Sequence, residues 1–225
     1  MLDKLQSIRF ELSGFCNYNH ELCPKSRDNT RVSLSTDAIK RVMVDIPGFS
    51  GDVGFHNHNE PTIDPRLYSI VSMAKGIWPK CTVSIYTNGE FLDENLIKEG
   101  IDAGVDKFNI TAYSDSVRGY FKESRHVSVY DVKFDGRLGI YDRAISPNNI
   151  PCGAPVCQIV ISRYGDVCLC CQDWNNTVTF GNVYSQSIVS CFPEMEKVYN
   201  KLMSGDRDME PCRRCSRTRI KYISE

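Results

Sequence analysis

The segment from Cys16 to Pro24 carries three residues of types that bind transition metals. Cys16, His20 and Cys23 are spaced C-x3-H-x2-C. Thiolates three and two residues apart can converge on one iron–sulfur cluster, and imidazole replaces thiolate in Rieske centres, where it raises the reduction potential. The same residues also suit a structural zinc site, or a loop with an incidental histidine. The spacing therefore predicts a metal loop and leaves these alternatives open.

Charge and hydropathy argue against several classes of function. The 225-residue chain holds 27 Lys and Arg against 28 Asp and Glu, so no overall basic field favours nucleic acid or an anionic membrane. No apolar stretch approaches the ~20 residues of a membrane span, and the N-terminus lacks a signal-peptide core. We expect a cytoplasmic protein without nucleic-acid or membrane partners. Its 11 cysteines are then metal ligands or buried hydrophobes instead of disulfides.

The first two thirds of the chain alternate strand and helix patterns. Strand-like runs lie at 7–12, 52–56, 82–86 and 107–113. Helical patterns follow the first three runs and begin at Ser35, Asp64-Pro65 and Asp93. Such units predict a parallel sheet with helices outside and functional loops at the carboxyl ends of the strands. Because the chain is too short for a full barrel of ~250 residues, we expect an α/β fold with a partial (β/α) barrel over residues 1–150, with a weak fifth strand at 127–132.

The composition changes after residue 150, because eight of the 11 cysteines lie beyond it. Two apolar runs, 158–162 and 167–170, flank Tyr164-Gly165-Asp166 and predict a β-hairpin, and a helical pattern covers 187–203. We therefore expect a small C-terminal module over residues 151–225, a hairpin plus helix with a metal site. Pairs of cysteines that converge after a hairpin also build zinc ribbons, so zinc remains the alternative to iron–sulfur here.

The order of these features resembles the radical S-adenosylmethionine (SAM) superfamily. In that family a C-x3-C-x2-C loop after the first strand holds three irons of a [4Fe–4S] cluster and leaves the fourth for SAM. Cys16 and Cys23 match the outer cysteines, and His20 stands in the place of the middle one. Residues 55–61 read FHNHNEP, similar to the family's Gly-x-Gly-Glu-Pro motif after the second strand. Residues 86–89 read YTNG after the third.

The resemblance implies a SAM pocket at the ends of these strands. Glu60 takes the family's role of binding the methionyl ammonium group, for which a carboxylate is suited. Asn57 and Asn59 occupy the glycine places of the motif, and asparagine accepts positive φ more readily than other residues with a side chain. Asn88 and Thr111 match positions that line the pocket. Without the resemblance, Asn88-Gly89 is an ordinary turn and Thr111 a buried strand residue.

The C-terminal pattern of cysteines resembles the twitch module, the short form of the SPASM extension. It implies an auxiliary [4Fe–4S] cluster with four cysteine ligands, namely Cys152, Cys170, Cys212 and Cys215. Cys171 follows Cys170 directly and is expected to point to the other face of the hairpin strand, so we do not predict it as a ligand.

Together these resemblances imply an enzyme, a radical SAM oxidoreductase. In that family the reduced first cluster cleaves SAM to a 5′-deoxyadenosyl radical that abstracts hydrogen from the substrate, and a flavodoxin or ferredoxin supplies the electron. The lack of a further peptide-binding domain favours a small-molecule substrate, a sugar or cyclitol alcohol, over the peptides that SPASM-type enzymes modify. Because His20 replaces a cluster ligand, a catalytically degenerate iron–sulfur or electron-transfer protein is another alternative, as is a zinc-binding structural protein.

Overall fold

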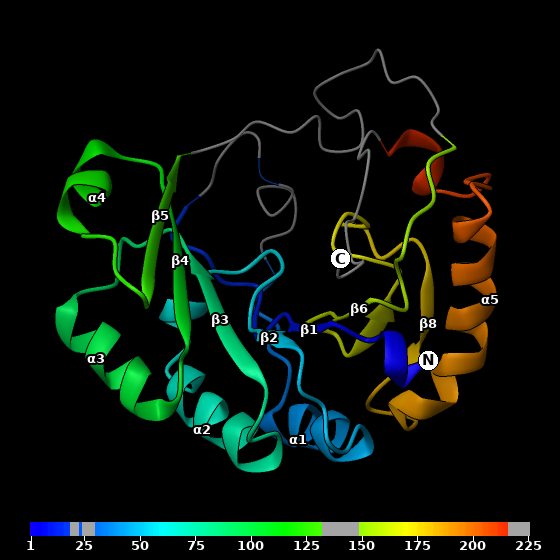
Figure 1. The fold of residues 1–225 in the computed structure, drawn as a ribbon, viewed down its shortest axis with the longest axis horizontal. Coiled ribbons are helices and arrows are strands. Elements are labelled where there is room, and N and C mark those ends of the chain that lie inside the picture. Colours follow the sequence, from blue (N-terminus) through cyan, green and yellow to red (C-terminus); the bar gives the residue numbers. More distant parts are fainter. Residues whose placement is uncertain (19–22, 24–29, 132–148, 216–225) are drawn as a thin grey trace.

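The computed structural model describes residues 1–18, 23, 30–131 and 149–215, so the predicted ligand His20 lies outside the described residues. The N-terminal part alternates strands and helices (Figure 1) in the order β1 (Ser7–Phe10), α1 (Thr36–Asp45), β2 (Asp52–Gly54), α2 (Leu67–Ile77), β3 (Thr82–Thr87), α3 (Glu94–Ala103), β4 (Lys107–Ala112), α4 (Asp115–Tyr120) and β5 (Val127–Asp131). The C-terminal part contains β6 (Gln158–Ile161), β7 (Asp166–Cys168), β8 (Thr179–Asn182) and α5 (Phe192–Met203).

The strands of both parts form one sheet, in the order β5-β4-β3-β2-β1-β6-β7-β8. Strands β1 to β5 pair in parallel, and β6 also pairs in parallel with β1, from Ser7 opposite Gln158 to Phe10 opposite Ile161. The hairpin of β6 and β7 therefore extends the sheet of the barrel at its β1 edge. The predicted α/β class is confirmed, whereas the division into residues 1–150 and 151–225 stays a prediction.

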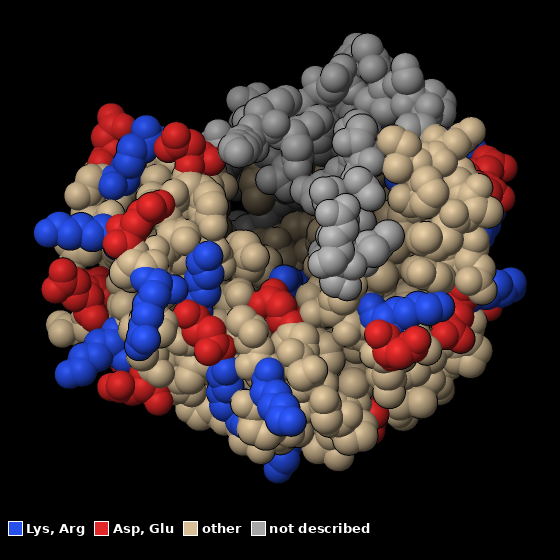
Figure 2. Space-filling view, in the orientation of Figure 1, with Lys and Arg blue, Asp and Glu red and all other residues tan. Residues whose placement is uncertain are grey.

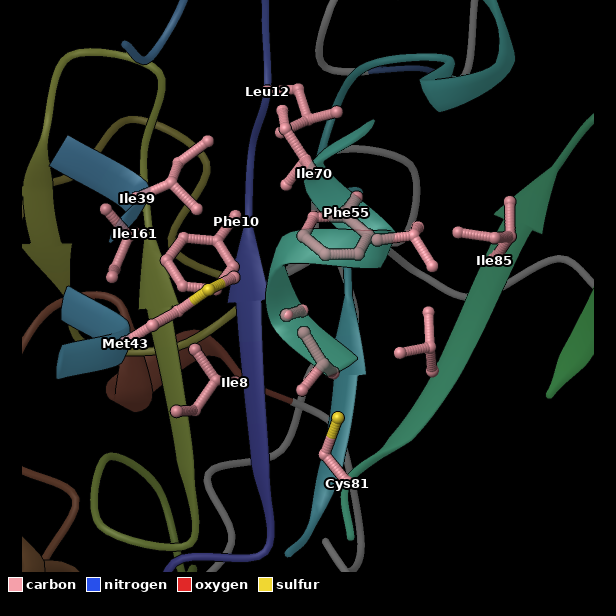
Figure 3. Packing of buried hydrophobic residues seen from close by; sticks show 14 of the residues in the cluster. Ile8, Phe10, Leu12, Ile39, Met43, Phe55, Ile70, Cys81, Ile85 and Ile161 are labelled. Carbon is pink, nitrogen blue, oxygen red and sulfur yellow. The ribbon is translucent and has the colours of Figure 1, made fainter. Parts of the chain in front are cut away.

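Side chains on the two faces of the sheet differ in kind, as the two-residue period of a strand requires. The outer face is apolar: Ile8 and Phe10 of β1 pack with Met43 of α1, and Phe55 packs with Ile70 of α2 (Figure 3). Burying each such side chain contributes roughly 1.5–3 kcal/mol. The inner face carries buried polar side chains from β1 and the residue after it, and from β3 and β4, namely Arg9, Glu11, Ser84 and Asn109. The sequence thus builds a dry outer core and a polar floor beneath the loops.

Helix α2 begins two residues later than the sequence predicts. Asp64 accepts hydrogen bonds from the backbone N–H of Arg66 (3.0 Å) and from its guanidinium (2.9 and 2.7 Å). The same guanidinium donates to the carbonyl oxygens of Leu34 (2.9 Å) and Leu12 (3.3 Å). These bonds hold residues 64–66 in a turn, so Pro65 precedes the helix instead of opening it.

A buried ion pair joins the barrel to the hairpin. Arg163, in the turn between β6 and β7, donates from Nη1 to Glu11 Oε1 (2.8 Å), and its backbone N–H donates to Glu11 Oε2 (3.1 Å). The hydroxyl groups of the neighbouring Tyr164 and of Thr30 lie 2.6 Å apart. Since Thr30 follows the predicted metal loop in the chain, the hairpin turn contacts the segment that closes this loop.

The surface agrees with the balanced composition. On the face shown in Figure 2, Lys and Arg side chains are interspersed with Asp and Glu. None of the helices in the described ranges has both the length and the apolar character that crossing a membrane requires.

Candidate functional site

A cleft of about 170 Å³ lies at the carboxyl ends of the parallel strands. The predicted cofactor residues that the structure describes in this half of the chain all line it, namely Cys16, Cys23, Asn57, Asn59, Glu60, Asn88 and Thr111. They come from the loop after β1 and from the ends of β2, β3 and β4. The topology therefore brings together residues that are up to about a hundred positions apart in the chain, as the parallel sheet predicts.

Glu60 is a buried carboxylate of this cleft that accepts four hydrogen bonds. Its side chain is buried, and Oε1 accepts hydrogen bonds from the backbone N–H of Thr62 (3.1 Å) and from the hydroxyl groups of Thr62 and Thr87 (both 2.6 Å). Oε2 accepts one bond, from the backbone N–H of Asn88 (2.8 Å). Among the described residues Glu60 has no ion-pair partner. A carboxylate offers about four acceptor sites, so Oε2 retains capacity for a cationic donor.

The motif loop is closed by side-chain hydrogen bonds and not by unusual backbone angles. Among the described residues Asn176 is the one non-glycine residue with positive φ, so Asn57 and Asn59 do not use the positive φ that asparagine tolerates. Instead, Asn59 Oδ1 accepts a hydrogen bond from the backbone N–H of Asn57 (3.1 Å), and Asn59 Nδ2 donates to the carbonyl oxygen of Phe55 (3.2 Å). The amide of Asn59 thus bridges the turn that glycine makes by backbone freedom.

Two residues between the predicted ligands anchor the metal loop to β3 and β4. Asn17 Oδ1 accepts a hydrogen bond from Asn88 Nδ2 (2.7 Å). Tyr18 donates its hydroxyl hydrogen to the carboxylate of Glu90, which raises the pKa of Tyr18 to about 12, and its ring centroid lies 5.3 Å from that of Tyr113. No local pattern in the sequence reveals Asn17, Tyr18 and Glu90 as loop anchors, because their partners are far away in the chain.

His56 lies on the cleft floor, where its environment keeps it neutral. Its ring centroid is 4.4 Å from that of Tyr86, and its Nδ1 is buried without a hydrogen-bond partner among the described residues. Burial, together with the charges of Arg9 and His58, lowers the pKa of His56 well below 6.5. A neutral imidazole has one hydrogen-bond donor and one acceptor, so the group is suited to contact a polar ligand.

We expect His56, whose Nδ1 is buried, to make the protein less stable in mild acid. Below pH ~6.5 the unfolded chain binds a proton at His56 while the folded protein does not, so the free energy of unfolding falls, by up to about 1.4 kcal/mol per pH unit. His56→Gln should flatten the dependence of the unfolding free energy on pH, measured by urea denaturation between about pH 5 and 7. His126→Gln, on the loop before β5, is the control, and equal slopes in the two variants would contradict the prediction.

The four predicted ligands of the C-terminal module line one small, mostly apolar cavity. They are Cys152, Cys170 and the pair Cys212 and Cys215, and the cavity lies between the hairpin and α5. Burial, and next Cys152 and Cys215, raise the pKa of Cys212 to about 12. Burial also raises the pKa of Cys170, with neighbouring thiols adding to the shift. No three His, Cys, Asp or Glu side chains of the described residues lie close enough together to hold a single metal ion. Four cysteine thiols that line one cavity are the donor set of a [4Fe–4S] cluster.

Comparison with known proteins favours the iron–sulfur interpretation of these two sites over the zinc interpretation. Residues 152–216 match the SPASM family, an iron–sulfur cluster-binding domain. The S-adenosyl-L-methionine-dependent 2-deoxy-scyllo-inosamine dehydrogenase of Niallia circulans is 27% identical over 242 residues, which cover 97% of this chain and 96% of that protein. The chain is a radical SAM enzyme. The superfamily, the oxidoreductase class and the C-terminal auxiliary module predicted from the sequence are confirmed, and SAM and iron–sulfur are its cofactors.

Solved structures of radical SAM enzymes share this fold. The structure of BtrN in complex with AdoMet and 2-DOIA is 24% identical, with a TM-score of 0.84 over 95% of this chain and 93% of that chain. The structure of anSMEcpe with bound AdoMet is 14% identical, with a TM-score of 0.54 over 94% and 86%. At these identities the likeness establishes the fold alone, and it confirms the partial barrel of this radical SAM enzyme with its C-terminal iron–sulfur module.

Proposed function

We propose that this radical SAM enzyme oxidises an alcohol of a small cyclitol or sugar to a ketone. The observation that carries the proposal is the end-to-end similarity to 2-deoxy-scyllo-inosamine dehydrogenase, which spans both the barrel and the C-terminal module. An alcohol that becomes a ketone loses two electrons and two protons. One electron and one proton would leave together as a hydrogen atom, and the second electron would leave separately while the hydroxyl proton goes to solvent. SAM with the first cluster would supply the radical that takes the hydrogen atom, and an oxidised [4Fe–4S] cluster would supply the acceptor for the second electron.

We assign the two clusters to the two sites already described. Cys16, His20 and Cys23 hold the catalytic cluster, an assignment supported by the position of Cys16 and Cys23 on the same cleft as Glu60. Cys152, Cys170, Cys212 and Cys215 hold the auxiliary cluster, supported by their shared cavity. When loaded, the first cluster and SAM supply the radical. The chain itself fixes the metal loop through Asn17 and Tyr18 and excludes water around the thiols.

The cofactor pocket is built around the buried carboxylate. Glu60 binds the ammonium group of SAM through Oε2, because this oxygen has acceptor capacity and no Lys or Arg among the described residues lines the cleft. Asn57 and Asn59 shape the loop around that group, and Asn88 and Thr111 line the pocket. A ligand with one cationic and several neutral donor groups fits this set of acceptors.

The partners and the compartment follow from the same chemistry. A flavodoxin or ferredoxin delivers the electron that reduces the first cluster, and the substrate is a small molecule. A reducing compartment such as the cytoplasm would keep the cysteines as the thiols that the proposed clusters need.

Anaerobic reconstitution tests the proposed function. We expect about eight irons per chain, because two [4Fe–4S] clusters are present. With reductant, SAM and 2-deoxy-scyllo-inosamine or a related cyclitol, we expect one 5′-deoxyadenosine for each ketone formed, measured by mass spectrometry. Zinc without iron would instead identify a structural metal protein. Two clusters without any cleavage of SAM would identify a degenerate iron–sulfur protein, and cleavage without oxidation of any cyclitol would favour a peptide substrate.

Replacing His20 tests the unusual ligand. If its imidazole binds iron, His20→Cys should keep the first cluster and lower its reduction potential, since imidazole ligation raises the potential relative to thiolate. His20→Ala should make this cluster labile. Iron content and redox titration followed by electron paramagnetic resonance (EPR) measure both effects, with Asn19→Ala in the same loop as the control. An alanine variant with unchanged iron content, potential and stability would exclude His20 as a ligand.

A further inference from the structure

Arg207 lies in the wall of the cavity that the four cysteines line. It is one of few buried cations in the described part of the chain, with 7% of its surface exposed. Its Nε donates to the carbonyl oxygen of Ile150 (2.9 Å), and its Nη1 donates to that of Cys215 (3.5 Å). Both partners are neutral, so these bonds orient the guanidinium without neutralising its charge.

No described carboxylate forms an ion pair with Arg207. The two acids beside it in the chain are engaged elsewhere: Asp206 pairs with Lys201 (3.7 Å) and Asp208 with Arg213. A buried charge without a counter-charge is strongly unfavourable, so natural proteins almost always pair such a charge with one of opposite sign. Within the described residues, the place from which a compensating negative charge can come is the cavity that Arg207 lines.

A cluster held by four thiolates has the required charge. The negative charge of the four sulfurs exceeds the positive charge of the iron–sulfur core, and one-electron reduction adds a further negative charge. A fixed cation nearby stabilises the reduced form more than the oxidised form and so raises the reduction potential, since potentials depend on net charge and surroundings. In a buried site this effect is screened only weakly by salt.

We propose that Arg207 is the counter-ion of the auxiliary cluster and raises its reduction potential, so that the cluster accepts the second electron from the substrate alcohol. This inference rests on the proposed function, which requires such an acceptor. The acceptor gains one electron as the carbon radical loses one, and the hydroxyl proton leaves to solvent, so the step balances. Arg207 is thus a tuning residue that touches neither SAM nor the alcohol.

Arg214 provides a matched control. It lies between Cys212 and Cys215 in the chain, closer in sequence to two ligands than Arg207 is. Its side chain is 66% exposed and pairs with Glu210 (3.0 Å), so water and a carboxylate already compensate its charge. Both substitutions therefore remove one positive charge from a residue near the ligands in the chain, while burial and pairing differ.

The test is a redox titration followed by EPR, in a Cys16→Ala/Cys23→Ala background that retains only the auxiliary cluster. Arg207→Met should lower the potential by 59 mV or more, which is at least a tenfold weaker affinity for the electron. Arg207→Lys should lower it less, and Arg214→Met should leave it unchanged. Equal potentials in Arg207→Met and the unsubstituted background would overturn the proposal.

Arg207→Lys keeps the proposal testable if the methionine variant cannot hold the cluster. If the lysine variant retains its iron, the positive charge at position 207 stabilises the cluster. If both variants lose their iron, the proposal is overturned, and Arg207 supports the cavity only through the size and shape of its side chain. The titration needs neither SAM nor an alcohol, so it tests the role of Arg207 independently of the proposed function. If the proposed function is wrong, the unsubstituted protein itself will bind no iron at this site or will oxidise no cyclitol.

Discussion

Glu60→Gln is expected to weaken SAM binding by roughly 10- to 100-fold, the usual range for a lost hydrogen bond to a charged group. Glutamine keeps the size of the side chain and one acceptor oxygen for the donors of Thr62 and Thr87, so the loop should stay folded. It removes the negative charge and places an amide nitrogen near the backbone N–H of Asn88 or near the ligand. The ammonium group of SAM then lacks its anionic partner.

Isothermal titration calorimetry of the anaerobically loaded enzyme with SAM measures this effect. Thr87→Val is the structural control, because it deletes one neutral donor to Glu60 and leaves the charge in place. Its expected loss of affinity is about 2- to 10-fold. If Glu60→Gln binds SAM as tightly as the wild type while Thr87→Val does not, the carboxylate only supports the loop and another group binds the ammonium.

Elements with a local start signal could be predicted from the sequence. Ser35 Oγ accepts a hydrogen bond from the backbone N–H of Ala38, and Asp93 Oδ1 accepts one from that of Leu96, so α1 and α3 begin where their caps predict. The short elements α4 and β8 were missed. Strand β8 depends on distant partners, including the bond from Asn182 Nδ2 to Asp166 (2.8 Å), which no local pattern reveals.

In the site, too, features with a signal in the sequence could be predicted, and features that depend on distant partners could not. Strand order was enough to predict Glu60 at the cleft, because a parallel sheet brings its carboxyl ends together. The set of four cysteines was predicted from the resemblance to the twitch module, and the four side chains line one cavity. The addition of β6 to the β1 edge was not foreseen, since it depends on long-range pairing. Arg207 was overlooked because a lone arginine between two aspartates has the composition of a solvated loop.

Cys170→Ala is expected to uncouple the cleavage of SAM from the oxidation of the alcohol. The variant should lose the auxiliary cluster, so its iron content should fall from about eight to about four per chain. The first cluster and the Glu60 cleft lie in the other half of the molecule, so reductive cleavage of SAM to 5′-deoxyadenosine should continue. Without an acceptor for the second electron, ketone formation should be lost, and the measured ratio of 5′-deoxyadenosine to ketone should rise steeply.

Cys171→Ala is the control that makes this experiment decisive. Cys171 is adjacent to Cys170, and it contributes to the raised pKa of both Cys170 and Cys152, so it is the nearest competitor for the role of ligand. It is not part of the cavity that the other four cysteines line, and we expect its alanine variant to retain about eight irons and full ketone formation. The opposite pattern, with iron lost in Cys171→Ala and kept in Cys170→Ala, would exchange the two assignments. If Cys170→Ala and Cys171→Ala both retain two clusters and full activity, neither cysteine is a ligand of the auxiliary cluster. Cys152, Cys212 and Cys215 would then bind the metal without them.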